Sequence, residues 1–111
     1  MAYRTASIEE KIAEIVRRIV LAVHPERIIL FGSQARGQGN AQSDVDLLIV
    51  MREIGSRRRK VVELYRLLAG TGISKDIVIL TPEELERYQG IVGTIAQAAV
   101  REGKVVYEQA A

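Results

Sequence analysis

Apolar residues recur with helical spacing in two long stretches of the chain. After Ser7, which can cap a first helical turn, isoleucine and valine return every three or four positions as far as Val23. The same kind of pattern runs from Ser56 to Leu68 and is followed by Gly70, a residue type that commonly ends helices. The spacing predicts an amphipathic helix over each of these stretches.

Short apolar runs between and after these helices predict strands. The runs are Arg27–Phe31, Asp44–Met51, Lys75–Leu80 and, as a final edge strand, Lys104–Tyr107. The polar stretch between the first two leaves room for only a short helical turn, whereas a parallel crossover needs roughly a dozen residues or more, so these strands are expected to be antiparallel neighbours. The second and third runs flank a predicted helix that is long enough for a right-handed crossover between parallel strands.

The last third of the chain adds two more helix signals. Thr81-Pro82-Glu83-Glu84 has the cap, the first-position proline and the acidic first turn of a helix start. Further helix is predicted from Ile91 to Arg101, ended by Gly103. The chain is therefore predicted to have an α/β (α+β) fold, with a small mixed sheet flanked by helices. Its length of 111 residues and hydrophobic share of 48% are typical of a single domain covering residues 1–111.

Composition narrows the functions open to this chain. Cysteine is absent, which excludes disulfides and thiolate chemistry. No apolar run approaches the roughly 20 residues that span a bilayer, and the N-terminus lacks the apolar core of a secretory signal, so a cytoplasmic protein without a membrane partner is expected. A net charge of +2 and an aromatic share of 5% give little support for nucleic-acid binding, which therefore ranks last among the functions considered.

Positive charge is concentrated in the run Arg57-Arg58-Arg59-Lys60 at the start of the second predicted helix. Cations in a first helical turn oppose the helix dipole, and nothing in the sequence offsets that conflict. The run is predicted to contact an acidic surface or nucleic acid, and an acidic protein surface is favoured. A solvated helix face is the alternative.

Three aspartates are the candidate chemical groups. Asp44 and Asp46 lie two apart at the start of a predicted strand, so both side chains leave the same face. The rest of that strand is apolar, and two unpaired carboxylates there would repel each other and lose hydration, costs that bound Mg²⁺ or Mn²⁺ would relieve. If the second and third strands are parallel, Asp76 approaches the same point. The alternative for each aspartate is a solvated acidic group at the beginning of a strand.

Gly32 and Ser33 follow the first predicted strand and are expected at the same end of the sheet as Asp44. A glycine lets the backbone approach a ligand closely, and Ser33 adds a hydroxyl and an amide at the start of a possible helical turn. Both features suit a phosphate, although a plain strand-to-turn transition would also explain this pair alone.

Taken together, two motifs resemble the signature of the nucleotidyltransferase superfamily that includes DNA polymerase beta. They are Gly32-Ser33-Gln34-Ala35-Arg36-Gly37 and Ser43-Asp44-Val45-Asp46-Leu47. The chain looks most similar to the minimal nucleotidyltransferases of prokaryotes. The resemblance implies transfer of a nucleoside monophosphate, with ATP the expected donor, to an acceptor hydroxyl with release of pyrophosphate.

The resemblance also implies roles for individual residues. Asp44, Asp46 and Asp76 would be catalytic and would hold the metal ions, with Asp76 also helping to deprotonate the acceptor. Gly32, Ser33 and Ser43 would bind the nucleotide. Arg36 would either neutralise triphosphate charge or hold the loop to the domain.

In larger relatives an added domain holds the acceptor. The resemblance covers only the small nucleotidyltransferase domain, so the acceptor is expected to lie on another molecule. Minimal nucleotidyltransferases are often paired with a helical HEPN protein, an RNase toxin, and some act as antitoxins by adding AMP to a tyrosine of that partner. Two alternatives stay open: an antitoxin that neutralises its partner by contact alone, and a transferase that acts on a small molecule or on RNA.

Overall fold

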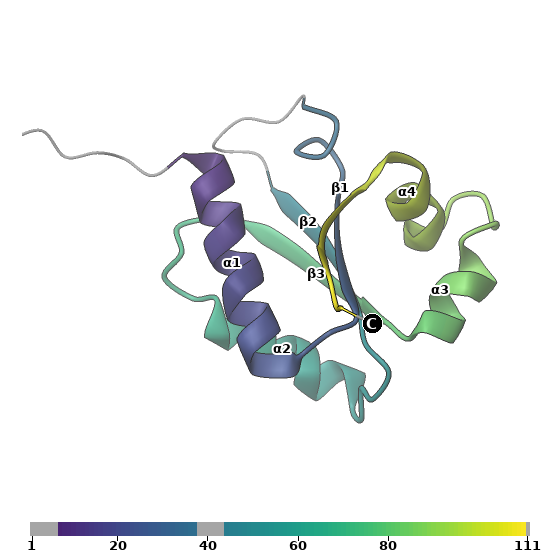
Figure 1. The fold of residues 1–111 in the computed structure, drawn as a ribbon, viewed down its shortest axis with the longest axis horizontal. Helices are drawn as coiled ribbons and strands as arrows, with labels where there is room; N and C mark the ends of the chain where they lie inside the picture. The colour runs from purple at the N-terminus through teal and green to yellow at the C-terminus, as the bar shows by residue number, and fades with distance from the viewer. Residues whose placement is uncertain (1–6, 38–43, 111) are drawn as a thin grey trace, which may run out of the picture.

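The computed structural model describes residues 7–37 and 44–110, which form a mixed four-stranded sheet with helices on both faces (Figure 1). The strand order is β3-β2-β1-β4. The strands are β1 (Arg27–Phe31), β2 (Val45–Val50), β3 (Lys75–Leu80) and β4 (Lys104–Glu108). The helices are α1 (Ile8–Val23), α2 (Arg57–Leu67), α3 (Pro82–Tyr88) and α4 (Ile95–Glu102). The α+β class predicted from the sequence is confirmed.

Strand pairing follows the expected directions. β1 is antiparallel to β2, with Phe31 opposite Asp46. β2 is parallel to β3, with Asp46 opposite Asp76. β4 lies antiparallel against the other side of β1, with a register irregularity between Ile28 and Ile29. The short β1–β2 connection and the helical β2–β3 crossover therefore set the strand directions as the sequence indicated.

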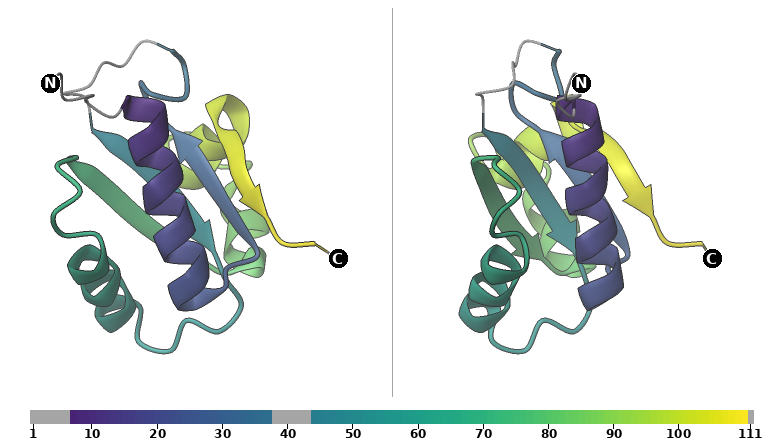
Figure 2. Two further views of the ribbon diagram at one scale, coloured as in Figure 1. Left: turned by 60° about the vertical axis from the view of Figure 1, so that its left-hand side comes forward. Right: turned by 90° about the vertical axis from the view of Figure 1, so that its left-hand side faces the viewer.

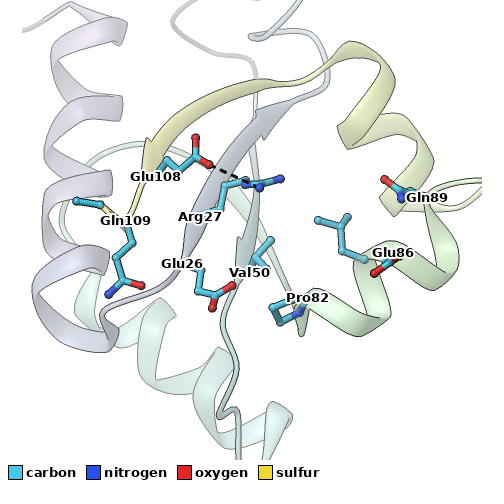
Figure 3. A pocket seen from close by; sticks show the side chains of 10 residues that line it. Glu26, Arg27, Val50, Pro82, Glu86, Gln89, Glu108 and Gln109 are labelled. Carbon is cyan, nitrogen blue, oxygen red and sulfur yellow. Dashed lines mark ion pairs between the residues drawn. The ribbon is translucent and has the colours of Figure 1, made fainter.

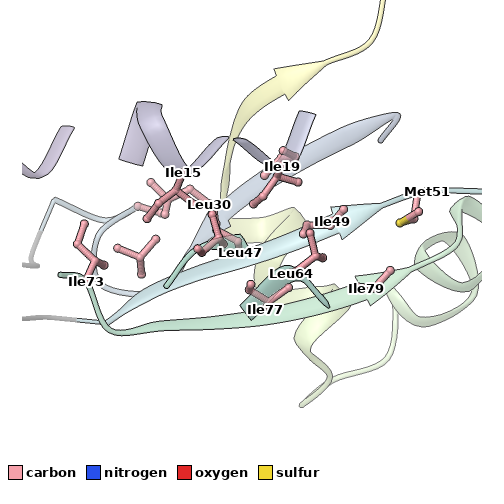
Figure 4. Close-up of a cluster of buried hydrophobic side chains, with 14 of the residues drawn as sticks. Ile15, Ile19, Leu30, Leu47, Ile49, Met51, Leu64, Ile73, Ile77 and Ile79 are labelled. Carbon is pink, nitrogen blue, oxygen red and sulfur yellow. The ribbon is translucent and has the colours of Figure 1, made fainter. Parts of the chain in front are cut away.

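The helices divide into two layers (Figure 2). α1 and α2 cover one face, where isoleucine and leucine side chains of the helices interdigitate with alternate residues of β1, β2 and β3 (Figure 4). α3 and α4 cover the other face through Leu85, Ala96 and Ala99. Because successive strand residues point to opposite faces, β2 contributes side chains to both cores.

Hydroxyl caps start all four described helices. The side chains of Ser7, Ser56, Thr81 and Thr94 each accept a hydrogen bond from a backbone N–H three residues on. The prediction of a last helix from Ile91 was wrong at its beginning. Gly93 has a φ of +88°, which cannot continue a right-handed helix, and α4 begins only after the Thr94 cap.

The hydroxyl of Tyr65 is engaged in a hydrogen bond, although 37% of the surface of this residue is exposed. One further sequence expectation needs correction. The basic run is partly used inside the chain: Arg57 donates to the carbonyl of Ile79 at 3.1 Å and pairs with Glu84. Glu84 also completes a capping box with Thr81, so a single carboxylate links the starts of α2 and α3.

The helices within 7–37 and 44–110 are all too short or too polar to cross a membrane.

Candidate active site

The candidate carboxylates gather at the end of the sheet where β2 and β3 begin and β1 ends. The parallel register places Asp46 directly opposite Asp76, and the antiparallel register places Phe31 on the other side of Asp46. Neighbouring residues Leu47 and Ile77 point into the core beneath α1 and α2. Asp46 and Asp76 therefore share the opposite face of the sheet, the face that α3 and α4 cover further along.

The pKa of the Asp46 carboxyl is raised above its ordinary value. Partial burial raises the pKa of its carboxyl, and the nearby charges of Asp76 and Asp44 raise it further. A hydrogen bond with the Asp76 carboxyl acts in the same direction, while the charge of Arg36 opposes it. Asp44 and Asp76 are exposed, so Asp46 lies innermost in a cluster of negative charge. A cation at this point would relieve the repulsion among the three groups.

Gly32 brings the backbone against the Asp46 carboxylate. Its φ of +77° is a conformation that side-chain-bearing residues rarely adopt. A Cβ at this position would overlap Oδ2 of Asp46 and lie 3.2 Å from its Cγ. The structure therefore uses both properties of this glycine, its backbone freedom and its missing side chain.

The segment after Gly32 forms the helical turn that the sequence suggested. The Arg36 amide donates to the Gly32 carbonyl at 3.2 Å, and the side chain of Ala35 is buried beneath the turn. Ser33 is half-buried at the start of this turn. Ser43, the remaining predicted nucleotide contact, lies outside the described residues.

Arg36 anchors the turn to the rest of the molecule. Its Nη1 lies 3.1 Å from Oε2 of Glu102, the last residue of α4. Of the two roles considered for Arg36, this contact supports the one in which Arg36 holds the loop to the domain. The charge of Arg36 also lowers the pKa of Asp46, so it acts on the carboxylates as well.

Sequence reasoning missed a tyrosine that fixes the beginning of β3. The Tyr65 hydroxyl of α2 accepts a hydrogen bond at 3.0 Å from the backbone N–H of Ile77, the residue after Asp76. β3 is an edge strand, so this N–H would otherwise face away from the sheet. No local pattern in the sequence signals the contact, because it depends on how α2 lies across the strand.

The donor chemistry at this end of the sheet suits a hard divalent cation such as Mg²⁺, which prefers carboxylate oxygens. Within residues 7–37 and 44–110, no three carboxylate or imidazole side chains are already arranged around one point. The fit therefore rests on the adjacent carboxylates of Asp46 and Asp76 and on the raised pKa of Asp46.

A separate cavity of about 430 Å³ lies at the opposite end of the strands (Figure 3). Arg27, Val50 and Pro82 line it, and Arg27 Nη2 lies 3.7 Å from Glu108 Oε1. Arg27 begins β1 and Val50 ends β2, so this cavity is a strand length away from the aspartates.

Carboxylates on adjacent strands beside a glycine turn, in a mixed sheet with helices on both faces, define an α+β protein with a candidate phosphate and metal site. The chain belongs to the nucleotidyltransferase domain family, whose model matches residues 9–108. The match includes the glycine turn and the three aspartates.

Individual relatives agree with this family. A protein of Methanocaldococcus jannaschii, provisionally named a protein adenylyltransferase, is 37% identical over 54 residues, which are 49% of this chain and 54% of that protein. The alignment thus spans about half the length of this curated relative.

Solved structures share the fold. A provisionally assigned nucleotidyltransferase from Sulfolobus solfataricus superposes with a TM-score of 0.59 and 23% identity, covering 98% of this chain and 93% of that one. A toxin–antitoxin structure with AMP-PNP gives 0.54 and 22% identity, covering 92% and 74%. A provisionally assigned minimal nucleotidyltransferase gives 0.52 and 24%, covering 92% and 98%. The nucleotidyltransferase fold expected from the sequence motifs is confirmed.

Proposed function

We propose that this chain is a metal-dependent adenylyltransferase that moves AMP from ATP to a hydroxyl group of a partner protein. The observation that carries the proposal is the contact of the Gly32 backbone with Asp46, which itself lies opposite Asp76. This arrangement puts a turn suited to phosphate beside carboxylates suited to a metal ion. Family membership supports the same chemistry.

In this proposal Asp44, Asp46 and Asp76 hold Mg²⁺. The metal would supply charge neutralisation for the triphosphate and polarise the transferred phosphoryl group. Gly32 and Ser33 position the outer phosphates through backbone amides and the serine hydroxyl, and Arg36 adds positive charge nearby.

In this proposal Asp76 receives the acceptor proton. Its exposure at the beginning of an edge strand, where a second molecule can approach, supports this role. The acceptor oxygen forms a bond to the α-phosphorus and the bond to the pyrophosphate oxygen breaks. Pyrophosphate leaves with the bonding electrons, and the hydroxyl proton passes to Asp76.

The proposed acceptor is a tyrosine of a helical HEPN-type toxin, which the transfer would inactivate, so that this chain acts as an antitoxin. Two findings support a protein acceptor. One relative is provisionally named a protein adenylyltransferase, and one structure of the same fold is a toxin–antitoxin pair with an ATP analogue.

Radiolabelled ATP tests the proposal directly. The protein is incubated with Mg²⁺, a small helical protein encoded beside its own gene, and ATP labelled on either the α- or the γ-phosphate. Label should enter the neighbouring protein from α-labelled ATP alone, and tryptic mass spectrometry should place AMP on a tyrosine. Asp46→Asn/Asp76→Asn should abolish the transfer.

Transfer of γ-label, or full transfer by the double variant, would refute the proposal. Neutralisation of the helical protein without any incorporation would instead establish an antitoxin that works by contact.

A further inference from the structure

The basic side chains of α2 fall into two groups that the sequence does not separate. Arg57 is bound to Ile79 and Glu84, and Lys60 Nζ lies 3.5 Å from Oε2 of Glu63. The remaining three, Arg58, Arg59 and Arg66, have no ion pair with any residue in the described part of the chain. The three arginines together line a single groove of about 600 Å³ on the outer surface of α2.

Apolar surface lies in the middle of this arginine groove. Val62, one helical turn from Arg58, Arg59 and Arg66, is 44% exposed and lines the same hollow. Arginines around an exposed aliphatic side chain are typical of protein interfaces, in which a small apolar centre is surrounded by charged groups.

The arrangement also has a cost that an external partner would remove. Arg58 and Arg59 lie in the first turn of α2, where their charges oppose the helix dipole, and the first turn contains no acidic residue. Glu63 is the only acidic group lining the groove, and Lys60 already pairs with it.

We infer that the arginine groove of α2 is a docking site for an acidic segment of the partner protein. Its charge is complementary to carboxylates, and the exposed Val62 gives an apolar contact that a phosphodiester backbone would not use. The inference rests on the proposed function for its biological use, because it states how the protein acceptor is held.

The position of the groove fits that use. α2 lies on the α1 side of the sheet, whereas Asp46 and Asp76 lie on the α3–α4 side. β3 is an edge strand, so its outer edge separates these two faces of the sheet, and α2 contacts β3 through Tyr65. A partner seated along α2 would pass the outer edge of β3 to reach Asp76, so docking and chemistry would use separate surfaces.

A matched pair of charge-reversal variants tests the groove. Arg58→Glu/Arg66→Glu alters it, and Arg87→Glu/Arg101→Glu makes the same change of net charge on exposed positions of α3 and α4. The probe is a fluorescent helical peptide with glutamates flanking a leucine stripe, and its counterpart has lysines in place of the glutamates. Binding is measured by anisotropy across a range of salt concentrations.

The glutamate peptide should bind the original chain and the α3–α4 variant equally, and the groove variant about tenfold more weakly and with a smaller salt dependence. The lysine peptide should show the reverse preference for the groove variant. In ¹⁵N spectra, the amide shifts caused by the glutamate peptide should be confined to residues 56–66.

The inference would be overturned if the glutamate peptide did not bind, or if both variants weakened its binding equally. It would also be overturned if an oligoribonucleotide bound at residues 56–66 more tightly than the peptide does. Mg²⁺-ATP binding is measured on the same samples by calorimetry and should be equal in the groove variant and the original chain. If the original chain did not bind Mg²⁺-ATP, the proposed function would be refuted. The peptide result alone would then decide whether the arginine groove is a docking site.

Discussion

Substitution of Gly32 by alanine separates the two demands that the site makes on this residue. The first demand is backbone conformation, because a φ of +77° costs an alanine roughly 1–2 kcal/mol. The second is space, because the new Cβ would overlap Oδ2 of Asp46 and force that carboxylate away. Gly55→Ala is the matched control, since Gly55 has a φ of +65° and nothing within 4 Å of the added carbon.

The control should lose about 1 kcal/mol of unfolding free energy, because the smaller entropy of the unfolded alanine chain offsets part of the backbone cost. Gly32→Ala should lose about 1 kcal/mol more, the usual cost of forcing a side chain off its preferred rotamer. At roughly 4 °C per kcal/mol for a chain of this size, the melting temperatures should fall by about 4 °C and about 8 °C.

Activity should distinguish the two variants more sharply than stability. Displacement of Asp46 by about an ångström should reduce AMP transfer about 100-fold in Gly32→Ala, while Gly55→Ala should transfer normally. Thermal melts and α-labelled ATP assays measure both effects on the same preparations. If Gly32→Ala behaved like Gly55→Ala in both assays, the close approach of Gly32 to Asp46 would have no part in the reaction.

Three other substitutions test separate features. Because the pKa of Asp46 is raised in the folded protein, ionisation of this carboxyl destabilises the fold as pH rises from the ordinary value of 3.8 through the raised pKa. Without divalent cations, Asp46→Asn should therefore have a higher melting temperature than the original chain at pH 7 and the same melting temperature at pH 3. The variant should also lose AMP transfer. The pKa of Glu84 is lowered by the backbone N–H of Thr81 and by Arg57. The ionised Glu84 carboxylate therefore contributes its full stabilisation of the fold above pH 4.5, and this stabilisation disappears as pH falls through the lowered pKa. Glu84→Ala should cost roughly 1 kcal/mol in urea melts at pH 7, and an equal loss in acid would contradict the capping box. Tyr65→Phe should lower kcat about tenfold with an unchanged KM for ATP, because it frees the strand at Asp76; an unchanged kcat would limit Tyr65 to folding.

Local sequence patterns were enough to predict most of this fold. β1 and β3 have the predicted bounds, because each is a short apolar run closed by residues that favour turns or caps. Loop length was enough for strand direction, which in turn predicted that Asp46 and Asp76 would meet. The beginning of α4 was misjudged because the apolar Ile91 and Val92 resemble a helix face, while Gly93 and Thr94 set the true boundary.

Contacts between distant residues could not be predicted in the same way. Arg36 and Glu102 are 66 positions apart, and Arg57 and Glu84 are 27 apart. Each pair forms only because packed elements bring the two side chains together, and many other arginine–glutamate pairs would have looked equally good in the sequence. The basic run therefore had to be resolved in three dimensions before Arg57 could be separated from Arg58.

The pairing of β1 with β4 sets an order on the assembly of this chain during synthesis. β1, β2 and β3 are complete by Leu80, whereas the partner of β1 on its other side begins only at Lys104. Until then, the edge of an almost wholly apolar strand stays open to pairing with other chains. A chain ending before Lys104 would keep the three aspartates together yet should aggregate, because the last strand protects an edge on which the candidate site does not depend.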